Sequence, residues 1–167
     1  AEPVDPNELV INGNCEGDDA SCFICRDGDG DGDVPRITDG VGYDNSRGVR
    51  VHAIATPQNA WDTQFFVYAH DYTLKAGDKF RFKMKARADK NANVSIQSHE
   101  KPGTYIHWQM LDNNYNITTK WQEFTYEGEI TEQQAGKNGM AAIAFNLNEA
   151  AQENNFYCDD MSWELYY

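Results

Sequence analysis

Hydrophobic and polar residues alternate with a period of two along much of the chain, a pattern typical of strands that bury one face. The clearest run covers residues 80–87, where apolar and basic side chains take turns: Phe80, Phe82, Met84 and Ala86 against Arg81, Lys83, Lys85 and Arg87. In a sandwich of two sheets the apolar set must point into the core. The pattern therefore predicts a strand with one buried and one solvent-facing side.

Similar runs are separated by clusters of Gly, Pro, Asn and Asp, and no segment requires a helix. They predict strands near residues 8–15, 47–55, 63–70, 78–88, 93–99, 104–110, 121–129, 139–148 and 156–166. Short strands at this spacing are typical of a β-sandwich jelly roll of two antiparallel sheets. The length of 167 residues fits one domain, residues 1–167, with the acidic segment 27–33 as a loop insertion.

Parity also assigns side chains to an outer sheet face. In the strand near 63–70 it turns Phe65, Val67 and Ala69 inward and Gln64, Phe66 and Tyr68 outward. In the strand near 139–148 the inward residues are Ile143, Phe145 and Leu147, and the outward ones are Ala142, Ala144 and Asn146. Large aromatic residues on an outer face indicate a function for that face. The small residues beside them leave its surface flat or hollow.

Aromatic and amide side chains together suit a carbohydrate ligand. Sugar rings pack their C–H patches on aromatic faces, and their hydroxyls bind planar polar groups. We therefore predict a glycan site formed by Trp61, Gln64, Phe66, Tyr68, Gln97, His99, Tyr105, His107 and Asn146. Three other tryptophans, Trp108, Trp121 and Trp163, are predicted to lie in the core.

The basic run has two interpretations. It is either an ordinary solvated face, or Arg81 or Lys83 contacts an acidic substituent of the glycan such as a glucuronate branch. The whole chain carries a formal net charge of -13, which disfavours nucleic acid and anionic membrane surfaces as partners. No apolar run approaches the ~20 residues of a membrane span. The opening AEPVDPNELV lacks the features of a secretion signal, so we expect one module of a larger protein.

The cysteines and the acidic loop leave alternatives open. The four cysteines permit two disulfides or four free thiols, and the lone C-x-x-C of Cys22 and Cys25 lacks the partners of a zinc site. Asp27, Asp29, Asp31 and Gly32 match the first half of an EF-hand loop. Position twelve of such a loop is Thr38 and not Glu, which excludes a complete EF-hand and leaves a partial calcium site or a solvated loop.

Catalysis is the alternative in a different class. Glycosidases use two carboxylates, and Glu100 and Glu123 lie at the ends of predicted strands. The sequence does not place them at the required separation of ~5 or ~7 to 9 Å. No Ser-His-Asp order, phosphate loop or H-E-x-x-H motif supports another reaction.

Several segments together resemble a known family. They are Glu8-Leu-Val-Ile-Asn-Gly-Asn-Cys-Glu16, Ile37-Thr-Asp-Gly40, Trp61-Asp-Thr-Gln-Phe-Phe66, Tyr105-Ile-His-Trp108 and Tyr157-Cys-Asp-Asp160. Their order and spacing resemble carbohydrate-binding modules of families 4, 9, 16 and 22, whose opening reads like NGDFE and whose last strand reads like YIDDV. The resemblance is strongest to family 4-like modules inserted in family 10 xylanases of gut polysaccharide degraders.

This resemblance implies a β-jelly roll with a glycan groove across its concave sheet, to which Trp61 and Gln64 contribute. It also implies a structural calcium ion away from that groove, bound by Glu16, by Asp159 or Asp160, and by backbone carbonyls, with Asn14 as a possible carbonyl donor. The chain departs from the family where Cys15 and Cys158 replace the usual Phe and Ile, and this pair is a candidate disulfide between the chain's ends.

The function that the resemblance implies is non-catalytic binding of a β-1,4-linked plant polysaccharide. Xylan and xylooligosaccharides are the leading candidate ligands. The module would raise the concentration of an attached xylanase on its substrate. We expect a secreted, cell-surface or periplasmic location. The alternatives are a jelly-roll glycoside hydrolase or lyase, and a calcium-dependent adhesion domain at the cell surface.

Overall fold

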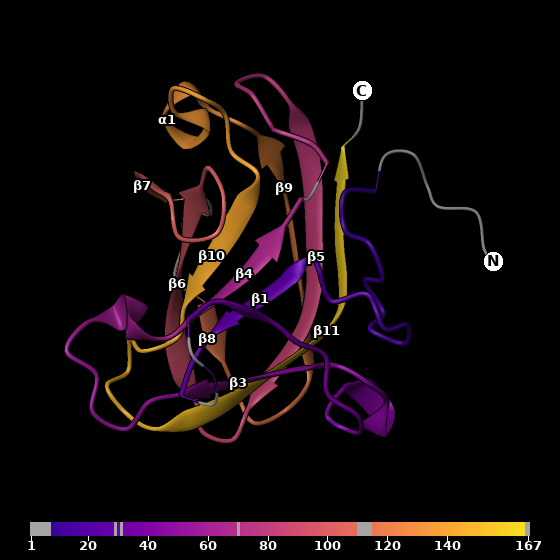
Figure 1. The fold of residues 1–167 in the computed structure, drawn as a ribbon, viewed down its shortest axis with the longest axis vertical. Coiled ribbons are helices and arrows are strands. Elements are labelled where there is room, and N and C mark those ends of the chain that lie inside the picture. The colour runs from indigo at the N-terminus through magenta and orange to yellow at the C-terminus, as the bar shows by residue number, and fades with distance from the viewer. Residues whose placement is uncertain (1–7, 29, 31, 70, 110–114, 166–167) are drawn as a thin grey trace.

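The computed structural model describes residues 8–28, 30, 32–69, 71–109 and 115–165, with the backbone alone for 107–109. Two antiparallel sheets stack face to face (Figure 1). The larger sheet contains β2 (Val34–Pro35), β1 (Phe23–Arg26), β4 (Gln64–Tyr68), β10 (Ala142–Asn146), β6 (Ala92–His99) and β7 (Tyr105–Gln109) in that order, and β8 (Tyr115–Ile117) also pairs with β6. The smaller sheet has the order β3 (Val49–Ala53), β11 (Asn154–Leu165), β5 (Lys79–Ala88) and β9 (Gln122–Glu129).

Helical structure in the described residues is short. The elements are η1 (Tyr43–Asn45), η2 (Ala60–Asp62) and α1 (Glu132–Ala135). None of the helices in the described ranges has the length and hydrophobicity of a transmembrane span. The predicted jelly-roll sandwich of two antiparallel sheets is confirmed.

The core lies between the sheets, and parity predicts its members well. The apolar side of β5 is buried, with Phe80, Phe82, Met84 and Ala86 all at most 3% exposed. Phe65 and Val67 of β4, Ile143 and Phe145 of β10, and Trp163 of β11 join the same buried cluster. The predicted inward positions of these strands are therefore confirmed, and the opposite parity forms the outer faces.

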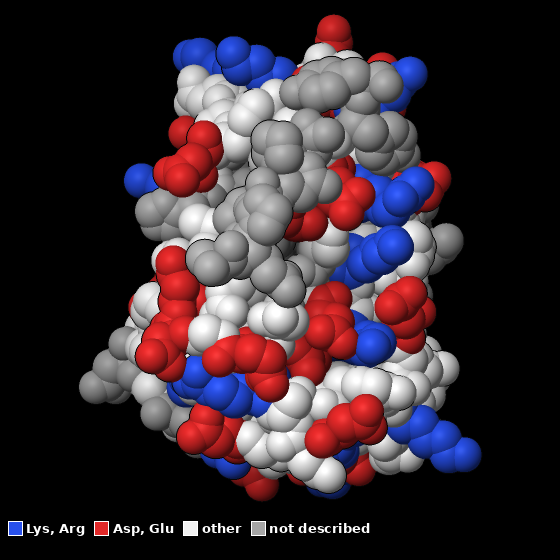
Figure 2. Space-filling view, turned by 90° about the vertical axis from the view of Figure 1, so that its right-hand side faces the viewer, with Lys and Arg blue, Asp and Glu red and all other residues white. Residues whose placement is uncertain are grey.

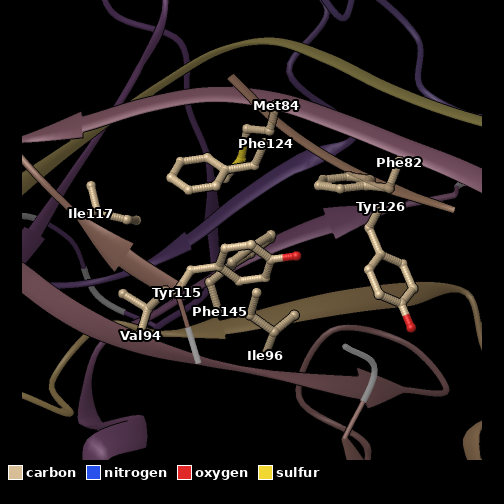
Figure 3. A pocket seen from close by; sticks show the side chains of 9 residues that line it. All are labelled: Phe82, Met84, Val94, Ile96, Tyr115, Ile117, Phe124, Tyr126 and Phe145. Carbon is tan, nitrogen blue, oxygen red and sulfur yellow. The ribbon is translucent and has the colours of Figure 1, made fainter. Parts of the chain in front are cut away.

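One apolar gap remains between the sheets. Figure 3 shows its lining, which includes Tyr115 of β8, Phe124 and Tyr126 of β9 and Phe145 of β10. Its volume is about 10 Å³, roughly the space that one water molecule needs. The gap is therefore a packing defect of the core and not a ligand site.

The predicted strand near residues 8–15 is wrong. The segment makes a single β-bridge, Glu8 to Glu164, and then turns, with Asn12 at φ 60° and Cys15 at φ 62°. The turn contacts β11 so closely that a Cβ on Gly13 would come within 1.9 Å of the Met161 carbonyl oxygen. The sequence Asn12-Gly13-Asn14 is a turn signal, and it overrides the apolar residues before it.

Strand β1 lies where the sequence indicated only a C-x-x-C motif. Phe23 and Cys25 point into the core, while Ile24 belongs to a separate cluster on the other face of the sheet. All four cysteines are buried and free in this structure, so the candidate disulfide between Cys15 and Cys158 is not formed and the alternative of free thiols holds. Burial raises the pKa of the Cys25 thiol to about 12, which makes it an apolar core residue.

The basic run of β5 lies on the outer face of the smaller sheet, on the side of the molecule that Figure 2 shows with red and blue side chains interspersed. Arg81 pairs with Glu127 of β9 and Lys85 with Asp160 of β11, at 2.6 and 3.0 Å. This is the solvated face of the first interpretation, stabilised by cross-strand charge pairs.

Trp121 lies on the same side and not in the core, contrary to the prediction. Its ring meets Tyr43 edge-on at 5.9 Å, and the Arg87 guanidinium lies 5.6 Å from its centre. A cation beside the aromatic face makes a partly exposed tryptophan favourable there.

Candidate functional site

The register of the larger sheet places the outward side chains in three transverse rows. The first row consists of Arg26, Gln64, Asn146 and Ser95, each opposite the next on β1, β4, β10 and β6. The second row is Ile24, Phe66, Ala144 and Gln97. The third is Tyr68, Ala142, His99 and Tyr105. Residues far apart in sequence therefore meet on one face because the strands pair in this order.

A pocket of about 460 Å³ opens on this face, within the range of small-molecule sites. Its lining consists of Arg26, Trp61, Gln64, Gln97, His99, Gly103 and Tyr105. Gly103 has a φ of 89° and lies so close to Arg26 that a Cβ would come within 3.1 Å of its Nη2 atom. The turn that carries Gly103 thus packs directly against the arginine.

Two exposed aromatic rings belong to the pocket. Trp61 is 54% exposed and comes from η2, which a capping box between Asn59 and Asp62 holds in place. Tyr105 is 38% exposed, comes from β7 and stacks on the ring of His99 with centroids 5.4 Å apart. Water-exposed aromatic faces beside a pocket favour a ligand with flat apolar patches.

The sheet beneath the pocket is apolar and closely packed. Phe66 is fully buried and clusters with Ile24 and Ala144. The His99 ring meets Phe66 edge-on at 5.2 Å, and the Arg26 guanidinium lies 5.5 Å from the Phe66 centre. Phe66 therefore supports the polar residues of the pocket and offers no exposed surface of its own.

The charge of Arg26 is compensated. Its Nε and Nη2 donate to both carboxylate oxygens of Asp33 at 2.7 and 3.0 Å, and Nη1 donates to Gln64 Oε1 at 2.8 Å. This bidentate ion pair fixes the guanidinium plane. The pocket therefore combines a neutral Arg–Asp unit with amide groups.

His99 is buried at 3% exposure, and within the described part of the chain neither ring nitrogen has a hydrogen-bond partner. Burial, followed by the charge of Arg26, lowers the pKa of His99 to about 4. The ring is therefore neutral at physiological pH, with one donor and one acceptor nitrogen. An unpartnered buried imidazole in a pocket lining is a site for a ligand hydroxyl.

The structure brings together most of the predicted glycan site. Trp61, Gln64, Gln97, His99 and Tyr105 line the pocket, Phe66 lies beneath it, and Asn146 is buried behind Gln64. Tyr68 shares the face but not the lining. The side chain of His107 lies outside the described residues.

Arg81 and Lys83 do not belong to this pocket, because β5 places both on the outer face of the opposite sheet. The sequence pattern did not predict Arg26 as a pocket residue, because the short strand that carries it overlaps the C-x-x-C motif. The run Phe23-Ile24-Cys25-Arg26 between two acidic stretches was the signal available in the sequence.

The two described carboxylates of the acidic loop, Asp27 and Asp33, pair with different arginines. Asp27 pairs with Arg36 and accepts from the backbone N–H of His52, and Asp33 pairs with Arg26. Asp29 and Asp31 lie outside the described residues. Its first and last carboxylates therefore tie the loop to Arg36, to β3 and to β1.

The predicted calcium ligands are partly brought together. Asp159 Oδ2 accepts from Tyr43 N and Ser46 Oγ, and Glu16 Oε2 accepts from Arg47 N, so both carboxylates reach the loop 42–48. Asn14 Oδ1 accepts from Glu16 N.

Asp160 does not join them, because a bulge in β11 turns it towards Lys85. Burial raises the pKa of Asp159, whose described partners are neutral donors. Two carboxylates beside loop carbonyls are chemically suited to a hard cation such as calcium. The described residues contain no group of three or more His, Cys, Asp or Glu side chains placed to hold a metal.

The candidate catalytic carboxylates are far apart in the fold. Glu100 follows β6 of the larger sheet, whereas Glu123 lies on the outer side of β9 in the smaller sheet. Stacked sheets lie ~10 Å apart, so this pair does not flank a common bond. The two strands therefore do not support the glycosidase alternative for Glu100 and Glu123.

Solved structures share this fold. The CBM22-1 xylan-binding domain of Paenibacillus barcinonensis Xyn10C superposes with a TM-score of 0.64 at 12% identity, covering 95% of this chain and 94% of that one. The N-terminal cellulose-binding domain of Cellulomonas fimi β-1,4-glucanase C gives 0.63 at 13%, covering 95% and 97%. A CBM4 structure gives 0.53 at 22%, covering 78% and 77%.

No protein-family model matches the chain, and no curated protein matches it in sequence. The similarity thus lies in the three-dimensional structure. The chain has the jelly-roll fold of the carbohydrate-binding modules of the family 4 and family 22 group, as its sequence motifs indicated.

Proposed function

We propose that this chain is a non-catalytic module that binds a neutral β-1,4-linked polysaccharide in the pocket on the larger sheet. Xylan is the leading candidate for this ligand. The observation that carries the proposal is the presence in one pocket of two exposed aromatic rings, Trp61 and Tyr105, and the buried His99, whose ring nitrogens have no hydrogen-bond partner among the described residues. The rings suit the C–H faces of sugar units, and the imidazole suits a hydroxyl.

The electrostatics of the pocket favour a neutral chain. Asp33 compensates Arg26, and His99 is uncharged at neutral pH. The protein's net charge of -13 repels polyanions over a longer range. A polysaccharide without acidic groups therefore fits the site better than a polyuronate does.

The proposed biological role is attachment. A module of this kind raises the local concentration of a catalytic domain on an insoluble or polymeric substrate. The fold shared with the xylan-binding domain of Paenibacillus barcinonensis Xyn10C supports such a role. We propose an attached xylanase and a secreted or cell-surface location on this basis.

Tyrosine variants on the two faces test the proposed site. Tyr105→Ala should abolish most of the retardation of the protein in a native gel containing soluble xylan, because stacking supplies much of the affinity. Trp61→Ala should do the same. Tyr43 has the same 38% exposure but lies over Lys85 on the smaller sheet, so Tyr43→Ala should keep full retardation.

Equal migration of the wild-type protein and the Trp61→Ala and Tyr105→Ala variants, each folded by circular dichroism, would contradict the assignment. Absence of retardation of the wild type by every glycan tested would favour the adhesion alternative. Release of reducing ends from xylan would favour the hydrolase alternative.

We also propose a structural calcium ion between the chain's ends. Glu16, Asp159 and carbonyl oxygens of the loop 42–48 would hold it. A Cβ on Gly42 would come within 2.3 Å of the Arg47 carbonyl oxygen and 2.6 Å of Asp159 Oδ2, so these two oxygens approach the same glycine. When bound, the ion would compensate a buried carboxylate that otherwise has neutral partners.

A further inference from the structure

A chain of hydrogen bonds runs across the larger sheet beneath the pocket. Arg26 Nη1 donates to Gln64 Oε1 at 2.8 Å, and Gln64 Nε2 donates to Asn146 Oδ1 at 2.8 Å. Asn146 Nδ2 donates to Ser95 Oγ at 2.9 Å, and Ser95 Oγ donates to Glu149 Oε1 at 2.6 Å. The first four members are the first transverse row of the sheet, so the strand register itself builds the chain.

The chemistry of its two ends fixes the direction of every bond. A guanidinium can only donate, and a carboxylate can only accept. With Arg26 at one end and Glu149 at the other, each member must accept from one side and donate to the other. The amide of Gln64 therefore has a single orientation, with its oxygen towards Arg26 and its nitrogen towards Asn146.

This orientation determines what Gln64 offers to the pocket. An amide has two N–H donors and two oxygen lone pairs, and the chain uses one of each. One N–H and one lone pair remain, as a donor and acceptor pair held by a rigid sheet. Such a pair suits the hydroxyls of one sugar unit, since each hydroxyl both donates and accepts.

We propose that Asn146, Ser95 and Glu149 are positioning residues that hold the Gln64 amide in its ligand-binding orientation without touching the ligand. This inference rests on the proposed function, because it concerns the same pocket. Asn146 is 1% exposed and Ser95 is 9% exposed, and neither lines the pocket. Their effect on binding would therefore pass through Gln64.

A double-mutant cycle separates positioning from general stability. Asn146→Ala should lower the affinity for xylohexaose about tenfold in calorimetry, since it frees the Gln64 amide to turn. In a Gln64→Ala background the same substitution should change the affinity less than twofold. Equal losses in both backgrounds would overturn the proposal.

Ser95 provides a conservative rescue. Ser95→Ala leaves the buried Asn146 Nδ2 without its acceptor and should weaken binding severalfold, whereas Ser95→Thr keeps the hydroxyl and should bind as the wild type does. Glu149→Gln should also retain binding, because its amide oxygen accepts from Ser95, while Glu149→Ala should weaken it. A Ser95→Ala variant that binds as tightly as the wild type would refute the role of the chain.

Asn154 supplies the matched control. It is a buried asparagine, 3% exposed, on the smaller sheet, where its side chain bonds to the backbone of Lys90. Asn154→Ala should lower the melting temperature much as Asn146→Ala does but leave affinity unchanged. If the wild-type protein binds no glycan, the proposed function fails; if it binds and the cycle shows no coupling, only the positioning role fails.

Discussion

At the scale of single residues, His99 is the group whose chemistry its surroundings change most. It packs between Phe66 and Tyr105, with ring centroids 5.2 and 5.4 Å away. Burial and the charge of Arg26 lower its pKa to about 4, while Asp33 acts in the opposite direction. A neutral ring is what a sugar hydroxyl needs, because it can accept as well as donate.

The lowered pKa predicts a pH dependence of stability. The unfolded chain protonates His99 near its ordinary pKa of about 6.5, whereas the folded protein resists until about 4. Between these values the unfolded state binds more protons, so the free energy of unfolding falls as the pH falls. The His99 contribution to this loss is at most about 3 kcal/mol.

Urea unfolding from pH 7 to pH 4 checks this prediction against His99→Phe, which keeps an aromatic ring but does not titrate. The wild type should lose more stability than the variant over this window. Parallel curves for the two proteins would show that His99 has no depressed pKa.

At the scale of elements, β11 and the N-terminal segment both contact the loop 42–48, through Asp159 and Glu16. The bulge after Asp159 sends neighbouring carboxylates in different directions, Asp159 into the loop and Asp160 to Lys85. The sequence indicated Asp159 and Asp160 as candidate ligands but not which of the two faces the loop. A bulge breaks the alternation of side chains on which parity arguments depend.

This geometry predicts which acidic residues govern a response to calcium. At a calcium concentration a hundredfold above its Kd, binding to the folded state contributes about 2.7 kcal/mol. This corresponds to a rise in melting temperature of roughly 5–10 °C for a chain of this size. Glu16→Gln and Asp159→Asn should lose the rise, and Asp160→Asn should keep it. A melting temperature that is unaffected by chelation would contradict the proposed calcium site.

At the scale of the whole molecule, the alternation of apolar and polar residues along the strands predicts most of the fold. The inward residues of β4, β5 and β10 were predictable because burial of one face is the strongest constraint on a two-sheet sandwich. The same parity identified Gln64, Gln97, His99 and Tyr105 as a set.

Strand order was not accessible in this way. Which sheet β5 joins decides that Arg81 and Lys83 lie away from the pocket, and pairing of β1 with β4 decides that Arg26 lies in it. These are contacts between residues distant in sequence, and local pattern does not encode them. The row from Arg26 to Ser95 exists only once β1, β4, β10 and β6 are in register.

We propose that the pocket formed by this register binds a neutral β-glycan. Titration calorimetry with xylohexaose and cellohexaose measures this binding most directly. Xylohexaose should show saturable one-site binding to the wild-type protein, tighter than that of cellohexaose, and little binding to Trp61→Ala. No heat of binding with either oligosaccharide, or undiminished binding by a folded Trp61→Ala variant, would contradict it.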